Sequence, residues 1–232
     1  MPAYFLHSGI LFGQARAAYE RMVNVPSDLS FDRREAFAAV LFAAAALEAW
    51  IAELELHASE GWLALGTSGA LAAWSYVMRE LEPTRASIRV KFSLAKAILS
   101  GTPYDKGTRP YQDFHLLLSI RDALVHMKPE RVSEGPADDQ SHTEKLLRAL
   151  ESRGLCGPEE AGTKSSWLPR IATRAIARWA CNVAADMVRS VAECLGSQIR
   201  DEVVVSMLIK PFERMPDTDA ASEPKQKVEG LE

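Results

Sequence analysis

Residues 36–54 read AFAAVLFAAAALEAWIAEL, and only Glu48 and Glu53 interrupt their apolar character. In length the segment imitates a transmembrane span. Alanine, however, drives little partitioning into lipid, and a carboxylate near mid-span costs about 2.5–3.5 kcal/mol even on the insertion scale. A helix that is apolar on nearly every side also suits the centre of a helical bundle. The segment therefore predicts a central bundle helix and no membrane partner.

The sequence on either side of this segment shows helical rather than strand periodicity. We expect a first helix over residues 4–23, ended by Val25-Pro26, and a long helix over residues 30–58 with Ser30 as its N-cap. Further helices are expected over residues 60–81 with a break near Gly66 and Gly69, 84–99 with Thr84 as cap, 111–127, 142–153 and 167–195. For the β-branched residues 203–209, a short strand and a last helical segment both stay open.

The expected fold class is all-α. We expect one helical-bundle domain over residues 1–215, a polar excursion at about 130–163, and a disordered acidic tail at 216–232. The length of 232 residues and a hydrophobic fraction of 47% suit a soluble globular domain with a real core. The three cysteines include no C-x-x-C pair, which predicts neither a disulfide framework nor a zinc site. Their sparse use and the lack of a secretory signal pattern predict a cytoplasmic location.

The charge balance excludes one class of nucleic-acid binder. Lys and Arg total 27 against 31 Asp and Glu, so the formal net charge is -4, which does not suit a protein that binds nucleic acid by charge alone. Residues 217–232 hold five carboxylates and two lysines, and thus three of these four negative charges. The rest of the chain is nearly neutral, and a local basic site for an RNA substrate is compatible with it.

Residues 111–129 read YQDFHLLLSIRDALVHMKP and form the most informative stretch. Helical spacing places Arg121 inside the apolar stripe of this helix. A guanidinium cannot lose its charge to escape burial, so it needs a partner. Glu48 lies in a comparable position, on a face of the long helix that also carries Phe37, Leu41, Ala44 and Ile51. We expect Arg121 and Glu48 to pair across the helix interface, either as a structural buried ion pair or as part of a site.

His126 follows Asp122 by four residues, so the carboxylate can orient its imidazole. Arg121 and His126 are five residues apart, which separates them by about 140° on a regular helix. They converge if the helix loosens before Pro129, or if two copies of the chain meet across a two-fold axis, which predicts a composite site at a dimer interface. The alternative is a surface histidine stabilised by the helix dipole.

The run Arg121-Asp122-Ala123-Leu124-Val125-His126 resembles the R-[polar]-x-x-x-H motif of the HEPN superfamily. An alanine-rich upstream helix that contains the sequence LEAW fits the same pattern, and the resemblance covers about residues 32–129. It implies a HEPN-like helical bundle, extended here by additional C-terminal helices and forming a homodimer. Many members are metal-independent endoribonucleases of toxin–antitoxin and defence systems, so RNA and an antitoxin or other regulatory protein become expected partners.

The resemblance also implies a role for each motif residue. His126 would move protons near neutral pH, and Arg121 would stabilise charge on the phosphate while the ribose 2′-OH attacks. Asp122 would orient the histidine or hold the helix end, and Glu48 would position Arg121. No cofactor or metal is expected.

In one subgroup the motif continues to a tyrosine that a partner antitoxin modifies, but this chain has Lys128 there. Control through that tyrosine is therefore not expected, and Lys128 would instead contact RNA phosphate.

Two alternative hypotheses compete with the ribonuclease hypothesis. One is a catalytically inactive HEPN-like helical dimer that serves as a binding or interaction module, and the other is an antitoxin-like or nucleotide-binding member of a pair. Weaker features add little. The spacing of Arg170, Arg174 and Arg178 favours a solvated helix face over an RNA contact, and Trp50, Trp62, Trp74 and Trp179 are expected to fill the core.

Overall fold

The computed structural model describes residues 5–24, 29–59, 69–127, 142–157, 167–195 and 206–216, and within these ranges all regular secondary structure is helical. The all-α class is therefore confirmed. The helices are α1 (Ser8–Asn24), α2 (Leu29–Ser59), α3 (Gly69–Leu81), the short 3₁₀ helix η1 (Glu82–Thr84), α4 (Ile88–Ser100), α5 (Tyr111–Val125), α6 (His142–Glu151), α7 (Trp167–Ile171) and α8 (Arg174–Leu195).

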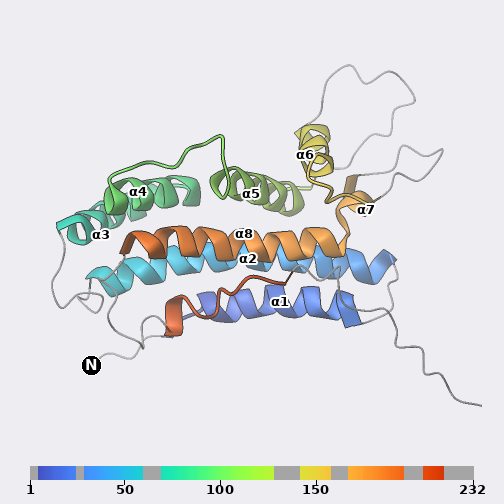
Figure 1. The fold of residues 1–232 in the computed structure, drawn as a ribbon, viewed down its shortest axis with the longest axis horizontal. Helices are drawn as coiled ribbons and strands as arrows, with labels where there is room; N and C mark the ends of the chain where they lie inside the picture. The colour runs from blue at the N-terminus through green and yellow to red at the C-terminus, as the bar shows by residue number, and fades with distance from the viewer. Residues whose placement is uncertain are drawn as a thin grey trace, which may run out of the picture.

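The centre of the bundle is formed by α2 and α8, which lie side by side, with α1 on one side and α3, α4 and α5 on the other (Figure 1). Along α2 the stripe that includes Ala39, Ala43, Leu47, Trp50 and Leu54 is buried. Its small alanine side chains let the neighbouring helices approach closely. Residues 33–59 are long and apolar enough, by composition alone, to cross a membrane, but 56% of their most apolar window is buried inside the bundle. Packing within the bundle thus accounts for their hydrophobicity.

Trp50 joins three parts of the fold. Its ring lies 5.9 Å from that of Phe92 on α4, and Phe92 in turn lies 5.1 Å from Phe114 on α5. Its indole Nε1 donates a 2.8 Å hydrogen bond to the carbonyl oxygen of Leu208. Trp50 and Trp74 are buried as expected, whereas Trp179 is half-buried and Trp62 lies outside the described residues.

The C-terminal segment, residues 206–216, packs back onto the bundle. It forms one helical turn at residues 206–208. Of the two alternatives for residues 203–209, the described part is therefore helical and not a strand. The ring of Phe212 stacks on Phe12 of α1 at 4.6 Å, and the Met215 amide donates a 2.7 Å hydrogen bond to Asn182 Oδ1 on α8. The expected tail beyond Asp217 falls outside the described residues.

The first helix begins at Ser8, so the expectation of a helix from residue 4 was wrong. Glu53 of α2 accepts hydrogen bonds from the His7 amide, from the Ser8 amide at 2.9 Å and from the Ser8 hydroxyl. A carboxylate from another helix therefore caps α1. Such a cap cannot be predicted from the local sequence, because the capping residue Glu53 is 45 residues away from Ser8.

Other helix boundaries also differ from the expectation, and α2 begins at Leu29, so that Ser30 lies inside the helix rather than at its N-cap. Thr84 does not cap α4: it ends η1, Arg85 adopts a left-handed conformation (φ 53°), and Ser87 is the N-cap residue. The expected helix over residues 167–195 is broken at Ala172 and Thr173, because the Thr173 hydroxyl accepts a 3.1 Å hydrogen bond from the Ile176 amide and starts α8. Consequently Arg170 is separated from the other two arginines and pairs with Glu151 at 2.6 Å.

We expect Glu53→Ala to lower the free energy of unfolding by about 2–3 kcal/mol, because it removes hydrogen bonds to a buried charged acceptor and leaves the start of α1 uncapped. Urea denaturation measures this change. Glu20→Ala serves as the control, because Glu20 is exposed and lies 3.8 Å from Arg16 in a surface pair. Equal stability of the two variants would contradict the capping role.

Candidate functional site

Arg121 of α5 lies between two carboxylates. One of its terminal nitrogens, Nη2, donates a hydrogen bond to Glu48 on α2, and the other, Nη1, lies 3.0 Å from Asp122 Oδ1. The pairing of Arg121 with Glu48 was predicted, and the structure brings both residues together with Asp122.

Of the two alternatives for this pair, the buried structural ion pair does not describe the structure. The Glu48 side chain is 48% exposed and that of Arg121 26%. Because α2 is apolar on nearly every side, its sequence does not reveal which face is covered, and Glu48 lies on the uncovered edge next to the exposed Ala52. The pair is therefore accessible to a ligand.

Arg121, Asp122 and Glu48 line a cleft of about 570 Å³ between α2, α5 and the segment that leads from η1 into α4. The floor is apolar, with Ile51 and Leu118 among its residues. This cleft is large enough for a small-molecule or nucleotide-sized group.

Three further cations line the same cleft, namely Arg85, Arg89 and Lys91. Arg89 donates a 3.1 Å hydrogen bond to the Ser119 hydroxyl of α5, and Lys91 lies 2.6 Å from Glu82. With Arg121 they make four cationic side chains against the three carboxylates Glu48, Glu82 and Asp122. The cleft therefore has a formal charge of +1 in a chain whose net charge is -4.

The cleft continues into a second hollow of about 510 Å³ that shares Ala52, Glu82 and Lys91 with it. Glu55 and Arg79 line this extension. Burial raises the pKa of Glu55, and the nearby Arg79 guanidinium opposes this effect. The two hollows adjoin each other beside α2, and we call them together the groove.

His126 lies at the C-terminal end of α5, where its amide donates a 3.0 Å hydrogen bond to the Asp122 carbonyl oxygen. It is exposed, and the described residues that line the cleft do not include it. Arg121 and His126 thus do not converge within one copy of the chain, as their five-residue spacing predicts. Lys128, the expected phosphate contact, lies outside the described residues.

The other histidine of α5 is not a substitute for His126. His115 is half-buried, and its Nε2 lies 3.3 Å from the Tyr111 hydroxyl. Burial lowers the pKa of His115, and the positive charges of Arg89 and Lys106 lower it further. His115 is therefore neutral at pH 7 and adds no charge to the cleft.

Sequence reasoning missed Arg85, Arg89 and Lys91. The only local signal is the basic run TRASIRVK that follows Pro83. Its position beside α2 depends on the turn at η1 and on the left-handed Arg85, which helical periodicity does not predict. The segment supplies more cations to the cleft than α5 does.

Comparison of the chain with models of protein families, with curated proteins and with solved structures gave no match. The function must therefore be inferred from the residues of the site themselves.

We expect Arg121→Gln to lower the free energy of unfolding by less than about 1 kcal/mol, because the Glu48 that it leaves behind remains hydrated. Urea denaturation measures the effect. Arg153→Gln is the matched comparison: Arg153 is 13% exposed, lies 2.8 Å from the buried Asp113, and its loss should cost about 2 kcal/mol or more. A larger loss for Arg121→Gln than for Arg153→Gln would mean that Arg121 is chiefly a structural residue.

Proposed function

We propose that this chain is a metal-independent endoribonuclease of the HEPN type, acting at the groove around Arg121. The observation that carries the proposal is a guanidinium fixed by Glu48 and Asp122 in the wall of a groove with three further cations. A preorganised guanidinium is suited to a phosphate on which negative charge increases during the reaction. Arg85, Arg89 and Lys91 would hold neighbouring phosphates of the RNA strand.

The chemistry would proceed by attack of the ribose 2′-OH on the adjacent phosphorus. His126 takes the proton of the 2′-OH as the 2′-O–P bond forms, and a proton is returned to the 5′ oxygen as the P–O5′ bond breaks. The products are a 2′,3′-cyclic phosphate and a 5′-OH. Arg121 stabilises the charge on the phosphorane oxygens, and Glu48 and Asp122 act as positioning residues for Arg121.

A second copy of the chain would complete the site. His126 is not in the cleft of its own chain, and its neighbours Val125 and Met127 are 55% and 54% exposed. Two large apolar side chains that flank a polar site residue favour coverage by a partner surface. In a two-fold homodimer the covering surface would be the end of the partner's α5, which places both histidines at one interface.

A non-catalytic binding module is the second candidate, and a specific observation favours it. Both terminal nitrogens of Arg121 are engaged by carboxylates, so the guanidinium can act as a clasp between α2 and α5. In that case the groove binds RNA or another anionic chain without cutting it. Cleavage and binding assays on one RNA separate the two functions.

We expect the purified chain to cleave mixed single-stranded RNA in the presence of EDTA, as measured by gel electrophoresis of labelled RNA. His126→Ala should lower the cleavage rate about 10²–10⁴-fold because it removes the proton-transfer group. Arg121→Gln should lower it about 10²–10³-fold because it removes the charge that stabilises the transition state.

His142→Ala is the matched control, since His142 is an exposed histidine at the start of α6, and its rate should equal that of the wild type. Equal cleavage by wild type and His126→Ala would exclude this mechanism. RNA that is bound but uncut by wild type, and no longer bound by Arg121→Gln, would establish the binding module instead.

We expect Val125→Asp to convert a dimer into a monomer, because it places a charge in the apolar contact beside His126. Light scattering coupled to size exclusion measures the mass, and RNA cleavage should fall in parallel. Val23→Asp is the control, because Val23 is similarly exposed but lies on α1. A wild-type monomer that cleaves RNA at full rate would refute the composite site.

A further inference from the structure

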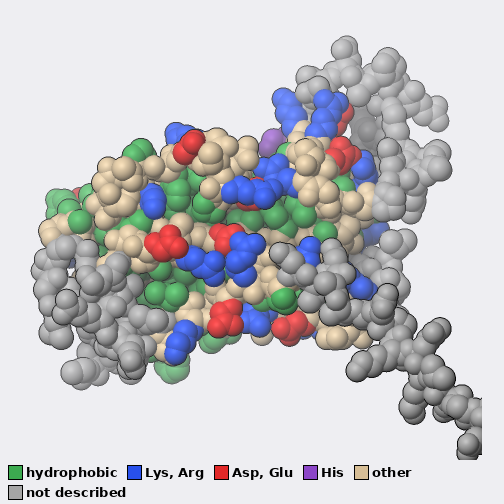
Figure 2. Space-filling view, viewed as in Figure 1, with side chains coloured by type: hydrophobic (Ala, Val, Ile, Leu, Met, Phe, Trp, Pro, Cys, Tyr) green, Lys and Arg blue, Asp and Glu red, His purple; other side chains and the backbone are tan. Residues whose placement is uncertain are grey.

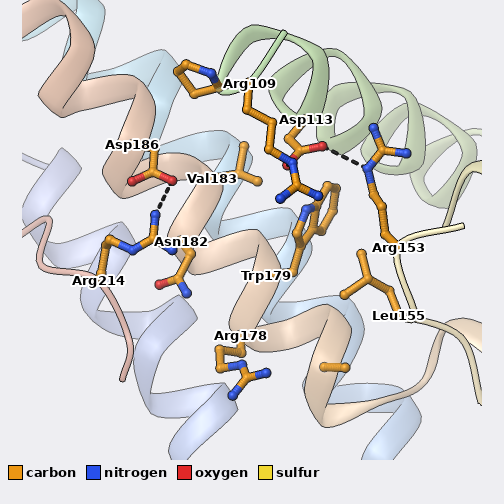
Figure 3. Close-up of a pocket in the computed structure, with 12 residues that line it drawn as sticks. Arg109, Asp113, Arg153, Leu155, Arg178, Trp179, Asn182, Val183, Asp186 and Arg214 are labelled. Atoms are coloured by element: carbon orange, nitrogen blue, oxygen red, sulfur yellow. Dashed lines mark hydrogen bonds and ion pairs between the residues drawn. The ribbon is translucent and has the colours of Figure 1, made fainter. Parts of the chain in front are cut away.

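A second charged pocket lies apart from the groove and shares no lining residue with it. It has a volume of about 260 Å³ and is enclosed by the start of α5, the turn after α6, the middle of α8 and the C-terminal segment (Figure 3). Its lining contains four arginines from four different parts of the chain, namely Arg109, Arg153, Arg178 and Arg214.

The pocket carries excess positive charge. Three of the four arginines pair with carboxylates of the lining: Asp113 pairs with Arg109 and Arg153, and Asp186 pairs with Arg214, so these five side chains have a formal charge of +1. Figure 2 shows Lys and Arg side chains gathered in the middle of this face of the molecule. Such a concentration of charge differs from the rest of a chain whose net charge is -4.

On one side of the pocket, Asp113 holds two arginines in place. Arg109 Nε lies 3.0 Å from Asp113 Oδ2, and Arg153 Nε donates a 2.8 Å hydrogen bond to Asp113 Oδ1. Figure 3 shows these two guanidinium groups on either side of the buried Asp113. One carboxylate thus orients two cations, and one positive charge remains uncompensated there.

On the other side, Arg214 pairs with Asp186, and hydrogen bonds between Met215 and Asn182 hold its segment on α8. Trp179 forms a flat wall between the two sides. Its indole Nε1 is buried and has no hydrogen-bond acceptor among the described residues. The ring of Trp179, rather than this inaccessible nitrogen, is the part that lines the pocket and that a ligand can contact.

We propose that this pocket binds a small phosphate monoester. Guanidinium forks match phosphate oxygens in geometry, and a phosphate monoester, with a charge of about -1.5 to -2 at pH 7, is attracted by the positive charge that Asp113 leaves uncompensated on Arg109 and Arg153. Trp179 supplies a stacking surface for a planar group attached to the phosphate. The volume lies just below the range of about 300–1,000 Å³ that is usual for small-molecule sites, which favours a ligand no larger than a mononucleotide. This inference does not depend on RNA cleavage at the groove.

Isothermal titration calorimetry of the full chain with AMP, inorganic phosphate and adenosine tests the proposal. AMP should bind, inorganic phosphate should compete with it, and adenosine should bind at least about tenfold more weakly because it lacks the charged group. Arg109→Gln should weaken AMP binding about tenfold or more. The variant should keep its fold, because Asp113 retains Arg153, and an unchanged melting temperature checks this.

Arg148→Gln is the matched control, since Arg148 lies on α6, is 56% exposed and pairs with Glu144, and neither residue lines the pocket. Arg121→Gln should also leave AMP binding unchanged, which separates this pocket from the groove. The proposal is overturned if AMP shows no binding at millimolar concentration, if adenosine binds as tightly as AMP, or if Arg109→Gln binds AMP like the wild type. Should Arg109→Gln melt earlier, Arg109→Lys, which keeps the charge but lacks the bidentate fork, takes its place with the same expected outcome.

Discussion

A long helix that is apolar on nearly all of its sides must be covered on nearly all of them, and the architecture satisfies this constraint. The alanines of α2 allow close packing of α1 and α8, while Trp50 stacks on Phe92 of α4, which in turn contacts Phe114 of α5. The cover is incomplete at Glu48 and Ala52, which are exposed and line the cleft beside α5 and the start of α4. The groove lies at this gap, so the same constraint that builds the core also places the candidate site.

At the groove, structural and functional roles of charge overlap. Glu48 pairs with Arg121 across the α2–α5 interface, yet the pair is hydrated enough to contribute little stability. Its main effect is to hold a guanidinium in one orientation. Preorganised charge of this kind serves a transition state better than a mobile side chain does, because little reorganisation is needed during the reaction. The cost is that both carboxylates compete with a phosphate for Arg121.

Helical periodicity was sufficient to predict the all-α class, the course of α2 and α5, and the pairing of Glu48 with Arg121. It failed where residues that are distant in sequence determine where a helix begins or which side chains are buried. The start of α1 is set by Glu53, which is 45 residues from Ser8, and the burial of Glu48 depends on which helices cover α2. The cations of the η1–α4 segment and the four-arginine pocket come from parts of the chain whose proximity only the folded structure reveals. The resemblance to the HEPN motif predicts which residues would carry out the reaction. It does not predict how they come together, since His126 does not line the cleft that contains Arg121.

The chemical identity of the RNA ends tests the central claim most directly. Mass spectrometry of fragments produced by the wild-type chain in EDTA should find 2′,3′-cyclic phosphate on one fragment and 5′-hydroxyl on the other. These ends arise only when the 2′-OH is the nucleophile. Fragments with 3′-hydroxyl and 5′-phosphate ends, or RNA that remains intact, would contradict a site in which Arg121 and His126 promote internal attack.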